Sequence, residues 1–225
     1  MVKFFPYIRF FEGSHTASNI RLKLDSLLEE SCLADPSLKK YCVNDGAANA
    51  RAAVRLSSGL EQYLCCLHIL QLAVTDVFYK SQVLSNDIGE IIEVLKSLAQ
   101  YVKKSPKAKG ELVTACKDVG IKFTMPKQSN KTRWGSILSN FSSCLKMKEA
   151  LSDLRNQDLE DWEGKLPSSV QLKIASGMVK ILERIDITTK KWEFDSKPTV
   201  QDVIPELWDL KSFLEQFIAN PMNDK

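Results

Sequence analysis

The chain has 225 residues, of which 44% are hydrophobic and 26% charged, and its formal net charge at pH 7 is +3. This composition is typical of a globular protein and argues against a disordered, collagen-like or coiled-coil chain. No stretch approaches the roughly 18 consecutive apolar residues of a membrane-spanning helix, so we expect no membrane span.

The charge is distributed unevenly along the chain. Residues 101–135 hold nine lysine or arginine residues against two acidic residues, a local charge of +7, so the other 190 residues sum to −4. A basic segment of this kind indicates a surface for an anionic partner such as nucleic acid. The alternative is a solvated, lysine-rich connection between helices.

The sequence lacks the motifs of several common enzyme and metal-site classes, which excludes those classes. The sequence has no G-x-x-x-x-G-K-[ST], no G-x-G-x-x-G and no G-x-S-x-G. Its two histidines, His15 and His68, are too few and too far apart for a zinc finger. The six cysteines form no C-x-x-C pair and the first residues do not resemble a signal peptide, which favours reduced thiols in the cytosol or nucleus.

In chain order, the first part of the sequence predicts short strands and helices. Residues 2–11 are β-type but contain Pro6, which suggests an edge strand. Thr16 or Ser18 can cap a helix, and a short strand over 39–44 precedes a helix over 47–56. The apolar run at 63–68 predicts another strand.

The rest of the sequence has helical periodicity. We expect helices at 69–80, 87–103, 108–118, 134–154, 169–190 and 202–218, with a loop over 122–134. Pro205 is expected in the first turn of the last helix, where it is tolerated. The predicted fold is therefore α/β and mostly helical, with an α/β part at 1–80 and a helical part at 81–225.

An ordered series of motifs runs through almost the whole chain: HTASNI at 15–20, NDGAAN at 44–49, CCLHILQLAVTD at 65–76, TRWGS at 132–136, KEAL at 148–151 and KPTVQDVIPELWDL at 197–210. The series resembles the hAT superfamily of DNA transposases and the host proteins derived from them. This resemblance implies that residues 1–80 form a partial, incomplete RNase H-like sheet and core, and that 81–225 correspond to the all-α insertion region.

The resemblance also implies site residues. Asp45 matches the second of the family's three catalytic acids, which together hold two divalent cations, Mg²⁺ in the intact enzymes. Cys65 and His68 match the family's C-x-x-H, which we interpret as structural rather than as a metal site.

DNA contacts are implied by the basic segment and the motif at its end. Arg133 and Trp134 match the family's R-W, in which the tryptophan resembles a stacking platform for a flipped base. The alternative is that Trp134 anchors a helix in the core. Six lysines of the basic segment complete the predicted DNA-binding set: Lys103, Lys104, Lys107, Lys109, Lys127 and Lys131.

The sequence departs from the family pattern in its acidic residues. Only fourteen residues precede His15, with Glu12 as their sole acid, and no equivalent of the family's final glutamate follows the helical region. One carboxylate cannot organise two metal ions. We therefore expect no catalysis and no cofactor for this chain by itself.

The leading functional prediction is a transposase-derived, non-catalytic DNA- or protein-interaction module in the nucleus, or in the cytoplasm if it is not imported. Exposed strand edges predict self-association as well. The first alternative is a fragment of an active transposase that cleaves and transfers DNA strands when missing segments are supplied. The second is a helical scaffold protein in which the motifs have no remaining role.

Overall fold

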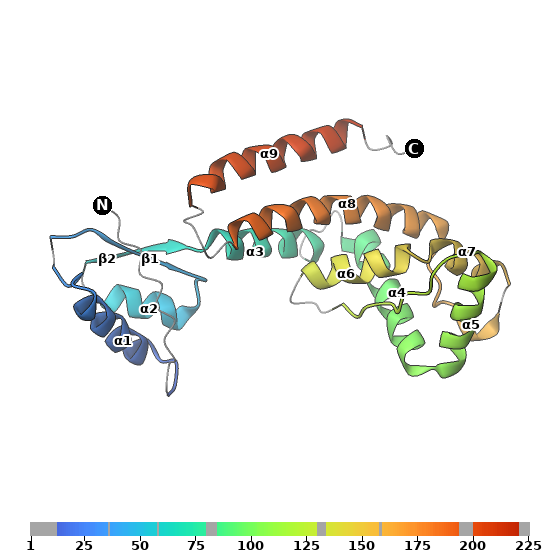
Figure 1. Cartoon of the computed structure of the whole chain (residues 1–225), viewed down its shortest axis with the longest axis horizontal. Helices are drawn as coiled ribbons and strands as arrows, with labels where there is room; N and C mark the ends of the chain where they lie inside the picture. Colours follow the sequence, from blue (N-terminus) through green and yellow to red (C-terminus); the bar gives the residue numbers. More distant parts are fainter. Residues whose placement is uncertain are drawn as a thin grey trace. The chain divides into compact units, whose positions relative to one another are not determined.

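The computed structural model describes residues 13–35, 37–57, 59–79, 85–129, 134–157, 159–193 and 200–220. Across these ranges the chain is mostly helical with a small parallel sheet (Figure 1), which confirms the mostly helical α/β prediction. The chain divides into two compact units, Met1–Ile69 and Leu70–Lys225. The strand predicted over 2–11 lies outside the described residues.

The first unit contains a β-α-β arrangement. Helix α1 (Ala17–Glu30) is followed by β1 (Lys40–Asn44), α2 (Ala48–Leu56) and β2 (Leu60–Leu64). The two strands are parallel and in register from Lys40 opposite Leu60 to Asn44 opposite Leu64, with α2 as the crossover that parallel pairing requires. Thr16 is the N-cap of α1, since its hydroxyl accepts a hydrogen bond from the Asn19 N–H at 3.3 Å.

The second predicted strand is displaced from its expected position. It occupies Leu60–Leu64 rather than 63–68, and the helix α3 (Cys66–Tyr79) already begins two residues later. The physical reason lies at Gly59, whose φ of +75° turns the chain directly into the strand after α2. The Ile69 N–H then donates to the Cys65 carbonyl at 3.0 Å, which closes the first helical turn.

One face of the sheet is open to solvent. Tyr41, Val43 and Tyr63 are 55–65% exposed, whereas Cys42 and Gln62 between or beside them are partly buried. The rings of Tyr41 and Tyr63 meet edge to face with centroids 5.5 Å apart. Cross-strand aromatic packing therefore stabilises a face that nothing in the described part of this unit buries.

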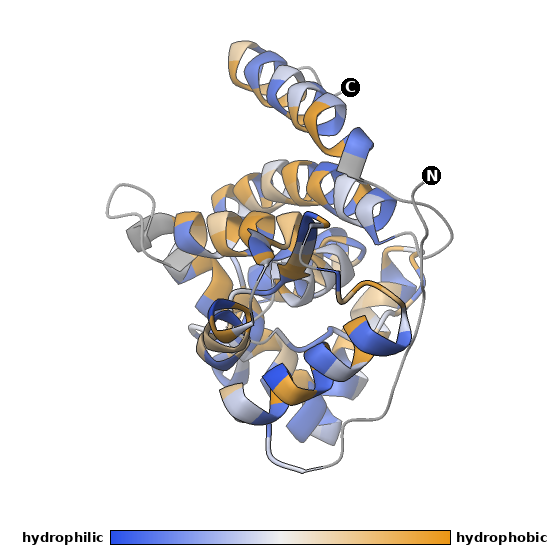
Figure 2. Cartoon of the chain, turned by 90° about the vertical axis from the view of Figure 1, so that its left-hand side faces the viewer, coloured by the Kyte–Doolittle hydropathy of each residue, from blue (hydrophilic) through white to orange (hydrophobic). Residues whose placement is uncertain are grey.

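The second unit is all helical beyond α3. It contains α4 (Ser85–Lys104), α5 (Pro106–Asp118), α6 (Trp134–Leu145), α7 (Lys148–Asn156), a 3₁₀ turn η1 (Glu160–Trp162), α8 (Ser169–Trp192) and α9 (Val200–Ala219). Helix α4 packs against α5 and α6, α5 against α7, α6 against α8, and α8 against α9. The helices are amphipathic, as their alternating orange and blue stretches in Figure 2 show.

The core of this unit is a continuous apolar cluster. Its fully buried members include Leu95, Leu98, Leu112, Ile137, Phe141, Leu151 and Leu182. Burial of these side chains is the main stabilising contribution to the helical unit. None of the helices in the described ranges is long and apolar enough to cross a membrane.

Two helix predictions are corrected. The helix expected over 134–154 is two helices, because the chain turns at Lys146–Met147 and the Met147 N–H bonds back to the Cys144 carbonyl at 3.0 Å. The turn leaves the Met147 side chain fully buried. Helix α9 begins at Val200, so Pro205 lies inside the helix, beyond its first turn, where it removes one backbone donor.

Candidate functional site

Residues of the NDGAAN and CCLHILQLAVTD motifs lie at one edge of the sheet, where the two parallel strands end. Asp45 follows β1 and Cys65 follows β2, and the Cys65 N–H donates to the Asn44 carbonyl at 2.7 Å. Such edges commonly hold ligands in α/β proteins. Asp45 and Cys65 therefore lie at the same edge of the sheet.

Asp45 lies exposed in the turn between β1 and α2. Its Oδ1 accepts a hydrogen bond from the Ala47 N–H at 2.9 Å, and the Gly46 N–H donates to Asn44 Oδ1 at the same distance. Gly46 has a φ of +83°, which a side chain would strain. The aspartate thus has a local structural role, since it satisfies a backbone donor at the start of α2.

The first two motifs are joined by their asparagines. Asn49 Nδ2 donates to the His15 carbonyl at 2.6 Å, and Asn19 Nδ2 donates to the Ser14 carbonyl at 2.9 Å. The Asn49 bond ties the segment before α1 to the beginning of α2, and the Asn19 bond ties the same segment to α1. The role of His15 in this arrangement comes from its backbone carbonyl, while the cap of α1 is its neighbour Thr16.

Cys65 and His68 are both partly buried at the start of α3. Their spacing places them on the same side of the first helical turn. In the described ranges, no three histidine, cysteine, aspartate or glutamate side chains form a group that could hold a metal ion. Asp45 brings one carboxylate to this edge, which does not fit the two-metal arrangement that the family resemblance implies.

The predicted DNA-binding lysines belong to the second unit. Lys103 and Lys104 end α4, Lys109 lies in α5, and Lys127 lies in the segment that precedes α6; all four are exposed. Lys131 and Arg133 lie outside the described residues. Sequence analysis singled out neither Lys117 nor Lys122, which are also exposed and add to the same basic region.

Trp134 is buried at the start of α6. Its side chain is 6% exposed and belongs to the apolar cluster of the helical unit. A base could stack on the indole only if the ring left that cluster. Of the two roles that the sequence left open, the arrangement favours the packing role.

Asn140 connects the segment before α6 to two helices. It is fully buried in α6, and its Nδ2 donates to the Lys127 carbonyl at 2.5 Å and to the Leu95 carbonyl of α4 at 3.3 Å. The Lys127 N–H in turn donates to Ser143 Oγ at 2.9 Å. The backbone that carries Lys127 is therefore fixed against α4 and α6 from two sides.

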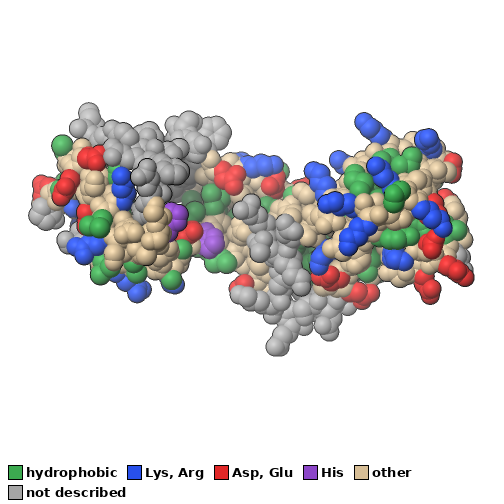
Figure 3. Space-filling model, turned by 90° about the horizontal axis from the view of Figure 1, so that it is seen from below, with side chains coloured by type: hydrophobic (Ala, Val, Ile, Leu, Met, Phe, Trp, Pro, Cys, Tyr) green, Lys and Arg blue, Asp and Glu red, His purple; other side chains and the backbone are tan. Residues whose placement is uncertain are grey.

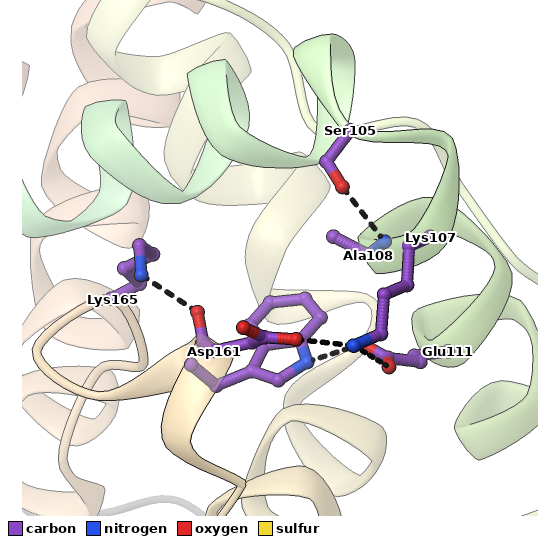
Figure 4. Close-up of polar contacts among 7 residues, drawn as sticks. Ser105, Lys107, Ala108, Glu111, Asp161 and Lys165 are labelled. Carbon is purple, nitrogen blue, oxygen red and sulfur yellow. Dashed lines mark hydrogen bonds and ion pairs between the residues drawn. The ribbon is translucent and has the colours of Figure 1, made fainter.

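Among the predicted lysines that the structure describes, Lys107 is distinguished by acidic partners from the described part of the chain. Figure 4 shows its ammonium between Asp161 of η1 and Glu111 of α5. The hydrogen bond from Lys107 and its charge hold the pKa of the Asp161 carboxyl below its ordinary value, and the same contacts raise the pKa of Lys107. Both groups stay charged at neutral pH, so Lys107 is committed to an ion pair within the unit.

Next to the Lys107–Asp161 ion pair lies a buried tryptophan contact that the sequence did not predict. Trp162 is 2% exposed, donates from Nε1 to Glu111 at 2.8 Å, and packs edge to face on Tyr101 with ring centroids 5.1 Å apart. Burial, followed by the nearby charges of Asp161 and Glu111, raises the pKa of the Tyr101 hydroxyl. A lone tryptophan within the acidic stretch 158–163 was the available signal.

Replacement of Trp162 by phenylalanine is expected to lower the free energy of unfolding by about 1–2 kcal/mol, because the ring packing is largely kept while the bond to Glu111 is lost. The measurement is the urea midpoint at constant m-value. Glu111→Gln retains an acceptor and should cost less. An unchanged midpoint in Trp162→Phe would contradict a stabilising role for this bond.

Compared with known proteins, the chain matches no protein-family model and no curated protein.

Proposed function

We propose that the helical unit binds nucleic acid through an exposed lysine surface, composed of Lys103, Lys104, Lys109, Lys117, Lys122 and Lys127. The observation that carries this proposal is the contrast with Lys107: within the described ranges no ion pair reaches any of these six ammonium groups. An exposed cation without an acidic partner is available to a phosphate oxygen.

The arrangement of the backbone brings separate parts of the lysine surface into reach of one ligand. Asn140 fixes the Lys127 carbonyl beside Leu95 of α4, and Lys103 follows about 12 Å further along that helix at 1.5 Å per residue. Figure 3 shows basic side chains spread over the lower face of this unit, with most acidic ones toward its edges. A polyanion with regularly spaced phosphates fits such a surface.

The chemistry of lysine limits what the surface can recognise. An ammonium group is a point charge that neutralises phosphate without the paired geometry of an arginine fork. Binding through it depends on counterion release, is sensitive to salt and carries little sequence information. The proposed activity is therefore sequence-tolerant binding of DNA or RNA, without a chemical step.

On the ordered motifs alone we also propose a transposase origin for the chain, with the first unit derived from an RNase H-like core and the protein acting in the nucleus. A second candidate function is metal-dependent DNA cleavage in an assembly that supplies the missing carboxylates, favoured by the exposed position of Asp45 at the carboxyl edge of the strands. Because Asp45 Oδ1 already accepts the Ala47 N–H, we rank binding above cleavage.

The test is the salt dependence of DNA affinity for the full chain, measured by fluorescence anisotropy with a short labelled duplex and a labelled single strand. Lys122→Gln with Lys127→Gln should weaken binding at low salt and make the slope of log affinity against log salt shallower by about 2, since each lost phosphate contact contributes roughly 0.9.

The matched control is Lys190→Gln with Lys191→Gln, which removes the same charge from lysines held by Asp186 and Glu206. We expect the control to bind nearly as the unchanged chain does. Equal losses in the two variants, or no binding by the unchanged chain at low salt, would refute the proposal. Mg²⁺-dependent cleavage that disappears with Asp45→Ala would establish the second candidate.

A further inference from the structure

Helix α9 is held on α8 by one of its faces. Leu210 is 5% exposed, Phe217 lies over Gly177 of α8, and Arg184 and Lys191 of α8 form ion pairs with Asp209 and Glu206. Figure 1 shows the two helices running side by side. Contact with α8 therefore explains why this inner face of α9 is apolar.

A second apolar stripe lies on the part of α9 that α8 does not cover. Ile204 is 68% exposed, Leu207 43%, Trp208 62% and Ile218 76%. With 3.6 residues per turn, these positions span about a third of the helix circumference. The exposed positions on the remaining side include the polar Ser212 and Gln216. A concentrated patch with an exposed tryptophan marks an interaction surface.

Two charged residues lie in the middle of this stripe. Lys211 and Glu215 occupy the positions between Trp208 and Ile218 and are 60% and 65% exposed. Their side chains are 3.6 Å apart, and the Lys211 ammonium lies 5.0 Å from the centre of the Trp208 ring. The lysine is thus already directed along the stripe between an aromatic ring and a carboxylate.

When a second copy of α9 runs in the opposite direction, these four residues meet residues of complementary type. Trp208, Lys211, Glu215 and Ile218 are spaced three, four and three residues apart, so two antiparallel copies of the stripe align residue by residue. Trp208 then faces Ile218 of the second copy, and Lys211 faces its Glu215, each contact occurring twice. A parallel pair would instead oppose lysine to lysine.

We propose that this stripe is a homodimer interface, in which α9 packs antiparallel against α9 of a second copy of the chain. Opposite charges at the centre set the register and orientation, as flanking charges do in paired helices. Trp208 supplies the type of anchor that most often dominates an interface. Two helices of about 30 Å form a smaller contact than a standard interface, so the dimer should be weak and dependent on concentration.

Charge reversal tests both the surface and its register in the full chain. Lys211→Glu places two glutamates opposite two glutamates in a homodimer, and Glu215→Lys does the same with lysines. Each single variant should sediment as a monomer at concentrations at which the unchanged chain is partly dimeric. An equimolar mixture of the two variants should dimerise again, because every opposed pair is then oppositely charged.

Sedimentation equilibrium over a concentration series measures these states, and circular dichroism melting verifies that the variants are folded. Gln216→Glu, which adds a charge on the polar side of α9, serves as the control and should dimerise like the unchanged chain. Trp208→Ser should weaken the dimer at least tenfold. A monomeric unchanged chain, or a dimer that persists in both single reversals, would overturn the proposal.

Discussion

Replacement of Trp134 by alanine is expected to lower the free energy of unfolding of the helical unit by about 3–5 kcal/mol, the range for removing a buried aromatic side chain. The indole is 6% exposed at the start of α6 and packs within the core. Urea denaturation followed by helical circular dichroism measures the change. A loss of this size would establish Trp134 as a packing residue.

The phenylalanine variant separates packing from base stacking. Trp134→Phe keeps most of the buried ring volume, so its stability should lie much closer to that of the unchanged chain. Its affinity for nucleic acid should equal that of the unchanged chain if the ring remains in the core. If Trp134→Ala kept its stability while its affinity for DNA fell strongly, the stacking role implied by the family resemblance would be supported instead.

The same residue shows why the sequence left two roles open. A tryptophan at the start of an amphipathic helix fits both a core position and an exposed platform, because periodicity gives the buried face but not the neighbours that cover a helix end. The decision depends on helices that are distant in sequence and pack around α6. Only the folded unit supplies that information.

Regular elements with strong local signals were predictable. A cap at Thr16 or Ser18 and the apolar period that follows it predicted α1, whose cap is Thr16, and the apolar spacing of α4, α8 and α9 predicted those helices. Their boundaries moved by a few residues at most. Local capping and periodicity were sufficient here because tertiary packing reinforces the same pattern.

Elements set by tertiary contacts were not predictable. The turn at Met147 splits a continuous helical pattern because its side chain is buried by other parts of the unit. Likewise, Lys107 was grouped with the other lysines, although Asp161, its partner, lies 54 residues away. Charge counting identifies a basic segment, but the free charges in it depend on which acids the fold brings near.

These distinctions sharpen the interpretation of the basic segment. The local charge of +7 over 101–135 includes Lys107, whose charge is balanced by Asp161 from another part of the chain. The described lysines of this segment that form no ion pair with another described residue lie on α4, α5 and the segment before α6. Asn140 joins the last of these segments to α4. Nucleic-acid binding would then depend on a buried amide that contacts no ligand.

Removal of that amide is the second large effect we expect. Asn140→Ala should lower the free energy of unfolding by about 2–3 kcal/mol, because the buried Leu95 carbonyl and the partly buried Lys127 carbonyl lose a donor and a small cavity remains. The loss is moderated because Asn140 Oδ1 is itself buried without a partner, a cost that the alanine removes. Urea unfolding measures the change, and Asn156→Ala at the exposed end of α7 is the control.

The consequence for function can be measured separately in the folded variant. Without Asn140, the backbone at Lys127 keeps its bond to Ser143 but loses its connection to α4, so amide hydrogen exchange should accelerate in residues 121–129 before it does in α4 or α6. DNA affinity should fall modestly while its salt slope stays the same, since no lysine has been removed. Faster exchange with unchanged affinity would show that the lysine surface does not depend on this connection, and an unchanged exchange rate would contradict the role assigned to Asn140.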